Sequence, residues 1–346
     1  MNPVKRIIGY GSFPYVSARV RTMRSNLLTS NDYRKLEKMS TAEILEFLQQ
    51  CDYKQDINRF SSEYDREDLL ELALRNHKAR VYSKLLDMSP EILQDLLRAY
   101  FQRIDLENVK TVLRSKRRGH DDIEDMLLPT QDLPEERLLE LADMERMEDL
   151  LAAIKLPGGD QLLDRAEPDD DLQTIEREID RAYYEHLINV ADEIPEQGQL
   201  FRRFLQLEVE SRNLSMILRL KRAGRNPEYI RDQLFDLPHT VRTVSHDDLI
   251  RAESYEDAIE LLKDEKIGSY IGSDNLAEVE RALDRYKLEQ GSTMLHQQPL
   301  SINPVLGYMI AKEAEIQNLR VILQANKADL GEEFMERNII HEVVER

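Results

Sequence analysis

One acidic segment of the chain has the residue types and spacing to bind a hard metal cation. It reads Asp121-Asp122-Ile123-Glu124-Asp125, with carboxylates at positions i, i+1 and i+4 that a single helix can present. Carboxylate oxygens are the ligands that Mg²⁺ prefers in proteins, and the bound ion can in turn hold a diphosphate. The segment therefore raises the hypothesis of a Mg²⁺-diphosphate site.

A Mg²⁺-dependent helical prenyl-transferring enzyme would need a second acidic segment facing the first. Asp169-Asp170-Asp171 is the only candidate, and the position equivalent to the first segment in the repeat described below is Asn226-Pro227-Glu228. Acidic residues are also common where a helix begins, because the positive end of the helix dipole stabilises them. The prenyl-transferring enzyme therefore remains only the alternative interpretation.

Other chemical motifs in the chain are weak. Gly9-Tyr10-Gly11 lacks the third glycine and the strand–helix context of a nucleotide-binding loop. The seven histidines and the single cysteine, Cys51, show no spacing typical of a zinc site. We therefore predict that the chain is not an enzyme and has no catalytic residue, metal or cofactor.

The strongest pattern in the sequence is a repeat with a period of 105 residues. Similar apolar segments start at Asn108, Asn213 and Asn318, and such self-similarity indicates a fold built from repeated units. Asparagine is a mediocre helix former, so three equivalent copies within helices need a reason. Each amide could line a hollow and contact a partner, but we favour a structural role at a junction between units.

Each repeated unit is predicted to combine a charged helix with a long amphipathic helix. The charged helices are expected at 65–88, 171–193 and 274–290. Pro90 and Pro195 can open two of the long helices, which run to Gly119 and Gly224. Glycine can adopt the left-handed conformation that often ends a helix. The third long helix is expected to begin around Pro304.

The chain starts with an incomplete unit. Tyr15–Arg24 is similar to the long helices, with Arg19 where the other copies have asparagine. The leftover copy at the C-terminus can therefore dock against the start of the chain. We expect an all-α fold in which three pseudo-threefold-related helical units close into a funnel or ring. The predicted units are 1–89, 90–194 and 195–303, with a C-terminal half-unit at 304–346.

Composition agrees with a helical protein outside the membrane. Charged residues make up 33% of the 346 residues, glycine is sparse, and the formal net charge of −19 argues against a general nucleic-acid binder. A single cysteine fits a reducing compartment. Neither a signal peptide nor a membrane span is expected, because the longest stretch without Asp, Glu, Lys or Arg contains two prolines and many polar groups.

These features resemble the C subunit of archaeal A-type and bacterial V-type ATP synthases, which is related to the d subunit of eukaryotic V-ATPases. The resemblance rests on Tyr-x-x-x-Arg-Val-Arg-x-Met at Tyr15–Met23, on the three asparagine helices and on the overall length. It implies a non-catalytic, peripheral subunit on the cytoplasmic face of the membrane. The implied partners are the membrane rotor (proteolipid) ring and the central-shaft subunits, with no nucleic acid and no small-molecule substrate. The implied role is to couple H⁺ or Na⁺ translocation to ATP synthesis or hydrolysis.

Two kinds of surface could contact such partners. Basic clusters end two of the long helices, at Arg114, Lys116, Arg117 and Arg118 and at Arg219, Lys221 and Arg222. They could bind an acidic partner, or they could simply interact favourably with the negative end of the helix dipole. Charge is sparse in 7–18 and 290–311, which contain Phe13, Tyr15, Leu306 and Tyr308. These residues could dock the rotor ring, or they could bury each other where the two ends of the chain meet.

Overall fold

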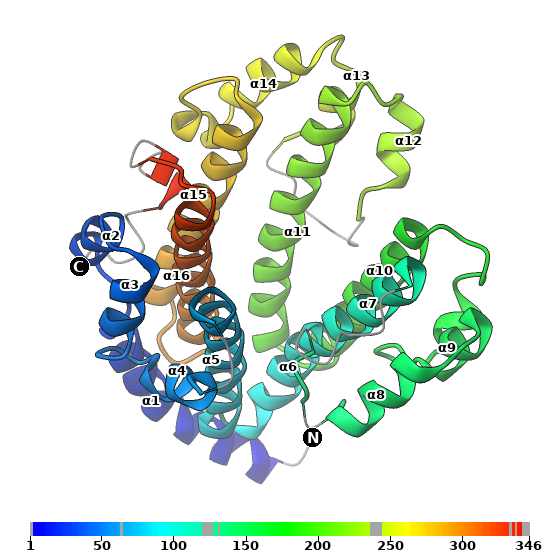
Figure 1. The fold of residues 1–346 in the computed structure, drawn as a ribbon. Helices are drawn as coiled ribbons and strands as arrows, with labels where there is room; N and C mark the ends of the chain where they lie inside the picture. Colours follow the sequence, from blue (N-terminus) through cyan, green and yellow to red (C-terminus); the bar gives the residue numbers. More distant parts are fainter. Residues whose placement is uncertain are drawn as a thin grey trace. The chain divides into compact units, whose positions relative to one another are not determined.

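The computed structural model describes residues 3–62, 65–119, 127–130, 132–235, 244–331, 334–335 and 338–340. As predicted, the fold is all-α (Figure 1), and within these ranges the only β-structure is an isolated bridge between Lys155 and Gln161. The chain forms two compact units. The large unit contains Met1–Val81, Met88–Pro90 and Leu200–Arg346, and the small unit contains Tyr82–Asp87 and Glu91–Gln199. The predicted repeat boundaries are different from this division and stay a prediction.

The small unit is built around three helices. These are α6 (Glu91–Phe101), α7 (Arg103–Arg118) and α10 (Leu172–Glu193). Helix α10 packs against both α6 and α7, and α8 (Glu135–Asp143) packs on α7. The short α9 (Met147–Ala153) packs on the 3₁₀-helix η2 (Leu162–Asp164). Leucines and isoleucines on the inner faces of these helices form the core, and Leu97, Leu113 and Ile179 are completely buried.

The large unit contains helices from both ends of the chain. Its long helices are α1 (Pro3–Arg24), most of α5 (Arg66–Met88), most of α11 (Gln197–Arg222), α15 (Leu276–His296) and α16 (Asn303–Lys327). Helices α15 and α16 pack along each other, and α1 packs on α16. Its short helices are α2 (Ser30–Leu36), α3 (Thr41–Leu48), α4 (Lys54–Phe60), α12 (Pro227–Asp232), α13 (His246–Arg251), α14 (Tyr255–Lys263) and the 3₁₀-helix η3 (Lys266–Tyr270).

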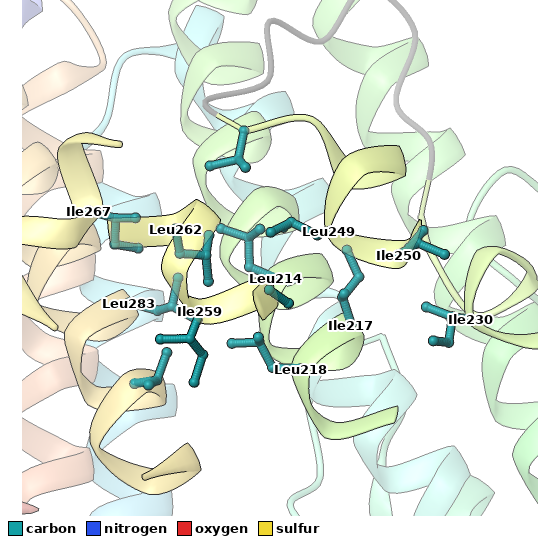
Figure 2. Close-up of a cluster of buried hydrophobic side chains, with 13 residues drawn as sticks. Leu214, Ile217, Leu218, Ile230, Leu249, Ile250, Ile259, Leu262, Ile267 and Leu283 are labelled. Atoms are coloured by element: carbon teal, nitrogen blue, oxygen red, sulfur yellow. The ribbon is translucent and has the colours of Figure 1, made fainter. Parts of the chain in front are cut away.

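One apolar cluster of the large unit shows why the short helices stay attached to the long ones (Figure 2). Leu214, Ile217 and Leu218 project from α11 toward Ile259 and Leu262 of α14. Leucine and isoleucine side chains of α12, α13, η3 and α15 complete the cluster. Burying each of these side chains contributes about 1.5–3 kcal/mol of hydrophobic free energy. A helix of six or nine residues would not be stable in water without such packing.

The three charged helices occupy the predicted positions. They are α5, α10 and α15, and the third extends to His296, six residues beyond its predicted end. Asp171 caps α10 by accepting a hydrogen bond from the backbone N–H of Thr174, and Asn275 caps α15 in a similar way. The prediction of one continuous helix from Pro90 to Gly119 is wrong. The structure has two consecutive helices there, α6 and α7, with Gln102 between them.

The long helices end in the left-handed backbone conformation, as predicted. Gly119 has φ 66° and Gly224 has φ 67°. The third copy has Asp329 at the equivalent position, and its φ is 51°. Glycine suits this conformation because it has no Cβ, and aspartate is one of the few other residues that tolerate it. The 105-residue period therefore extends to a backbone feature that the sequence similarity does not reveal.

Candidate functional site

Each repeated asparagine binds a later backbone segment with both ends of its amide. Asn108 on α7 donates from Nδ2 to the carbonyl of Leu128 over 2.7 Å, and its Oδ1 accepts from the N–H of Leu128 over 2.8 Å. The Asn108 side chain is buried. The amide thus satisfies one backbone donor and one backbone acceptor that would otherwise lack partners.

The same pair of hydrogen bonds between an asparagine amide and one later backbone residue, called a clamp below, occurs in the other two copies. Asn213 on α11 binds Phe235 with distances of 2.7 and 3.0 Å, and Asn318 on α16 binds Ile340 with distances of 2.8 and 2.9 Å. The clamped residue lies 20 residues after the asparagine in the first copy and 22 in the others. Each clamp joins two parts of one copy, so the amides satisfy backbone groups within copies.

A second repeated position, which was not identified from the sequence, is an acidic residue one helical turn before each asparagine. Asp105, Glu210 and Glu315 occupy it, and the 105-residue period alone could have identified them. Asp105 accepts a hydrogen bond from the hydroxyl of Thr130, and Glu210 is 2.9 Å from Nε2 of His246. Each long helix therefore presents a carboxylate and an amide on the same face.

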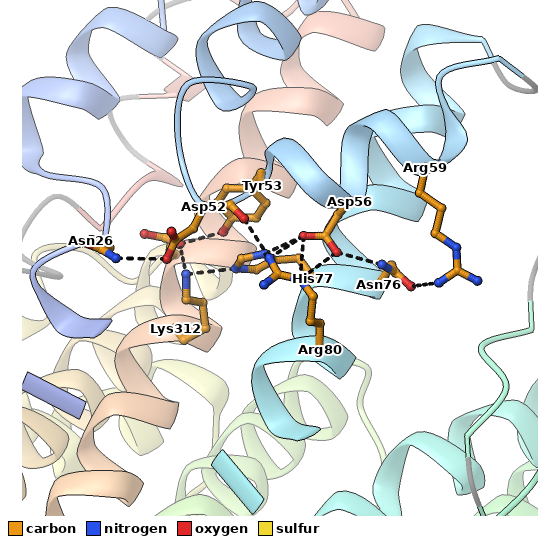
Figure 3. Close-up of polar contacts among 10 residues, drawn as sticks. Asn26, Asp52, Tyr53, Asp56, Arg59, Asn76, His77, Arg80 and Lys312 are labelled. Atoms are coloured by element: carbon orange, nitrogen blue, oxygen red, sulfur yellow. Dashed lines mark hydrogen bonds and ion pairs between the residues drawn. The ribbon is translucent and has the colours of Figure 1, made fainter. Parts of the chain in front are cut away.

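The carboxylate of Glu315 is fully buried and belongs to a polar network in the large unit (Figure 3). Its Oε1 accepts from Nζ of Lys312 and from the hydroxyl of Tyr53, each over 2.6 Å. Its Oε2 accepts from the backbone N–H of Leu28 over 2.6 Å. Lys312 itself is 2% exposed. A buried ion pair is tolerated only with such additional hydrogen bonds, because both charges have lost their hydration.

The network continues from Lys312 through a histidine to a second buried carboxylate. Nζ of Lys312 is 3.2 Å from Nε2 of His77, and Nδ1 of His77 is 2.9 Å from Oδ2 of Asp56. An ammonium group only donates, so the contact with Lys312 favours Nε2 as the acceptor and Nδ1 as the donor to Asp56, although the guanidinium of Arg80 also lies 2.9 Å from Nδ1. Burial lowers the pKa of His77, and the charge of Lys312 lowers it further.

Asp56 is stabilised as an anion by its neighbours. Burial alone would raise the pKa of this carboxyl, but hydrogen bonds from His77 and Arg80 outweigh burial and lower the pKa to about 2. Arg80 binds with Nη2 2.7 Å from Oδ2, and Asn76 donates to Oδ1 over 2.7 Å. The network thus connects α4 and α5, near the start of the chain, to α16 near its end (Figure 3).

Arginine–glutamate pairs connect the long helices to the charged helices in a regular order. Arg114 of α7 binds Glu176 of α10 through two bonds of 2.7 Å, and both residues lie in the small unit. Two further pairs lie in the large unit: Arg219 of α11 binds Glu280 of α15, and Arg320 of α16 binds Glu71 of α5 over 2.7 Å.

These pairs follow a cyclic order along the sequence. The long helix of each copy binds the charged helix that begins the next copy, and the last long helix, α16, binds the earliest charged helix, α5. Exposed ion pairs contribute little stability, with a median near 0–1 kcal/mol. These pairs therefore matter because they identify which helices are neighbours.

The predicted basic clusters are only partly available to a partner. Arg114 and Arg219 form the pairs described above, Arg117 donates to the carbonyls of Pro168 and Asp170, and Lys221 donates to those of Ile250 and Ala252. Lys116 is half-buried. Arg118 and Arg222 are exposed at the helix ends. Of the seven predicted contact residues, Arg117 and Arg219 are exposed as well, but they form the bonds described above.

The residues predicted to dock the rotor ring are mostly in the core. Phe13 and Leu306 have no exposed surface and Tyr308 is 1% exposed; α1, which carries Phe13, packs on α16, which carries the other two. This burial favours the alternative that these side chains are core, and their docking of the rotor ring stays a prediction. Tyr15 differs, with 57% of its surface exposed. Arg19 is also exposed on α1.

The structure gives no support to the alternative metal site. The segment 121–125 lies outside the described residues, and Asp171 is used as a helix cap. In the part of the chain that is described, no group of three or more His, Cys, Asp or Glu side chains could hold a metal ion. The same residues also include no helix long and apolar enough to cross a membrane.

Comparison with known proteins identifies the family. Residues 16–338 match the model of the ATP synthase (C/AC39) subunit family. The chain is 32% identical to the C subunit of the A-type ATP synthase of Methanococcoides burtonii, with 95% of this chain and 94% of the relative aligned. It is 33% identical to the corresponding C subunit of Methanosarcina acetivorans, over 97% and 95% of the two chains. It is 30% identical to that of Haloferax volcanii, over 95% and 98%. The chain therefore belongs to the C/AC39 family of ATP synthase subunits.

Proposed function

We propose that this chain is a non-catalytic central-stalk subunit of an A-type ATP synthase. It would link the membrane rotor ring to the central shaft and so couple ion translocation to ATP synthesis or hydrolysis. In this role it is a peripheral protein on the cytoplasmic face of the membrane. The family match along residues 16–338 and the names of the relatives support an ATP synthase subunit, and they give no support to a prenyl-transferring enzyme.

The main support for the proposed torque transmission is the cyclic order of the arginine–glutamate pairs. Three copies that each bind the next, with the last binding the first, favour a closed arrangement with pseudo-threefold symmetry. A closed ring or funnel can surround a shaft and transmit torque without opening. The buried network between α16 and the first helices supports the same interpretation, because it joins the two ends of the repeat series.

The exposed helix ends provide a test of the shaft contact. Charge reversal at Arg118 and Arg222 together should slow association with the central-shaft subunits by about tenfold or more, because exposed charges mainly steer the encounter. The wild-type on-rate should also fall as salt is added, since salt screens exposed charges. Surface plasmon resonance with the immobilised shaft subunits would measure both effects.

A matched control variant has the same net charge as the Arg118→Glu/Arg222→Glu variant. Lys38 and Lys54 are exposed residues of the large unit. Reversing the charge of both changes the net charge by the same amount and should leave the on-rate nearly unchanged. Equal slowing in both double variants would point to net charge alone. An on-rate insensitive to salt and to Arg118→Glu/Arg222→Glu would mean that these arginines only stabilise helix ends.

A further inference from the structure

The three repeated carboxylates differ in whether the chain supplies a positive partner. Glu315 is paired with Lys312, one helical turn earlier on α16, over 2.6 Å. Glu210 is 2.9 Å from His246 of α13, a residue that becomes a cation when protonated. In both copies a basic side chain thus lies directly against the carboxylate that precedes the repeated asparagine.

The third carboxylate, Asp105, has neither of these partners. In its copy, the position equivalent to Lys312 is Gln102, and the carboxylate accepts from the neutral hydroxyl of Thr130 instead of lying against a histidine. The pKa of Asp105 is raised to about 6, mainly by burial and also by the negative charge of Asp132, against the lowering effect of a hydrogen bond from Thr130. None of these influences comes from a cation.

A cavity of about 660 Å³ lies beside this carboxylate. Gln102, Asp105, Asp132 and Leu141 all line it, and every lining residue lies within the small unit. Its walls include the apolar side chains of Leu106, Val109, Ile154 and Leu156. The cavity therefore combines apolar walls with two carboxylates, a lining that fits an aliphatic chain with a cationic end.

A second observation points to the same kind of ligand. Oε1 of Gln102 is buried and has no hydrogen-bond partner. A buried carbonyl oxygen without a donor has lost its hydration with no compensation, so a ligand that donates to it gains affinity. Gln102 and Asp105 are three residues apart at the start of α7 and lie on the same face of that helix.

The basic residues around the cavity do not fill this role. Arg137 also lines the cavity, but its Nη1 binds Glu140 and its Nη2 donates to the carbonyl of Ala153. Lys155 lines it as well but is an exposed residue. Among the cavity-lining residues that the structure describes, no cation pairs with Asp105 or with Oε1 of Gln102, so both acceptors can take a donor from a partner.

We propose that this cavity is a binding site for an ammonium or guanidinium group on an aliphatic stem, namely a lysine or arginine side chain of a partner protein. The stem packs on the leucine and isoleucine walls, and the cationic head donates to Asp105 and to Oε1 of Gln102. The identity of the partner as an ATP synthase subunit rests on the proposed function, whereas the cation site itself does not.

The first test uses the isolated chain and small analogues of the two side chains. Addition of n-butylammonium or n-butylguanidinium should lower the pKa of the Asp105 carboxyl by at least half a unit at saturation. Titration of this carboxyl by ¹³C NMR would measure the change. The uncharged analogue n-butanol should not lower it, and Asp105→Asn should abolish binding of both cations. Failure of both cations to bind between pH 6 and 8 overturns the proposal, whatever the function of the chain.

The second test supplies the missing cation from within the chain. Gln102→Lys rebuilds the lysine–acid spacing of Lys312 and Glu315, so it should lower the pKa of Asp105 and block binding of n-butylammonium. Gln102→Met has a similar length but no charge and should leave the Asp105 pKa raised. If Gln102→Lys behaves like Gln102→Met, the cavity does not accommodate a cation next to Asp105 and the proposal is wrong.

The source of the cation can be tested in the assembled complex. A water-soluble carbodiimide with an amine probe should label Asp105 in the isolated chain, as detected by mass spectrometry of peptides. In the intact ATP synthase a partner side chain should protect Asp105, and extensive dialysis should not remove this protection. Protection that is lost on dialysis would indicate a free small amine. Full labelling of Asp105 in the complex would indicate an empty cavity. Either result would contradict a partner side chain as the occupant.

Discussion

Replacing Lys312 with methionine should lower the free energy of unfolding by about 3–5 kcal/mol, because it leaves the charge of a buried carboxylate uncompensated. Glu315 would keep the hydrogen bonds from Tyr53 and Leu28 but lose the ammonium group at 2.6 Å. His77 would also lose the donor to its Nε2. Urea unfolding followed by circular dichroism would measure the change.

Two further variants separate charge from packing. Lys312→Met with Glu315→Gln removes both charges and should recover much of the lost stability, since a neutral pair avoids the cost of burying an unpaired ion. Lys78→Met breaks a more exposed pair with Glu313, so it should cost less than about 1 kcal/mol. If Lys312→Met costs no more than Lys78→Met, the network does not hold α16 to the first helices in the way described.

The second large effect is expected at the asparagine clamps. Asn213→Leu should destabilise the chain by about 1–3 kcal/mol for each of the two buried backbone groups of Phe235 that it leaves without a partner. Leucine has the same branched shape and is somewhat bulkier, so no cavity forms, and the exchange measurement separates lost hydrogen bonds from overpacking. Amide hydrogen exchange should show a specific loss of protection at Phe235, in addition to the lower unfolding midpoint.

An exposed asparagine serves as the control for this substitution. Asn58→Leu lies on the surface of α4 and should change the unfolding free energy by less than about 0.5 kcal/mol. Asn318→Leu should reproduce the effect of Asn213→Leu, with the loss of protection at Ile340 instead. Unchanged protection at both backbone positions would contradict the clamp as a determinant of the fold.

The helices were predictable from the sequence because their signals are local. Asp171 caps α10, a proline precedes α6, and glycines end α7 and α11, so residue types at the boundaries agree with the apolar periodicity. The interruption at Gln102 was not predictable in this way, since the apolar pattern continues through it. The fold class and the repeat period followed from the sequence, but the interruption beside the cavity did not.

The clamps and the cyclic pairs needed the structure because their partners are distant. Leu128, Phe235 and Ile340 contribute only backbone atoms to the clamps, so their side chains carry no signal of this contact. Arg320 and Glu71 are 249 residues apart, and surface charges of both kinds are abundant in this chain. Apolar residues such as Phe13 and Leu306 are equally expected in a core and in an interface, so composition alone could not distinguish the two.

The link between the rotor ring and the shaft is tested most directly by capture from native membranes. The tagged full-length chain, incorporated in cells and solubilised in a mild detergent, should co-purify with both the proteolipid ring and the central-shaft subunits, identified by mass spectrometry. Arg118→Glu/Arg222→Glu should reduce recovery of the shaft subunits while the ring remains. Recovery of neither partner with the wild-type chain, under conditions that keep the ATP synthase intact, would contradict the account.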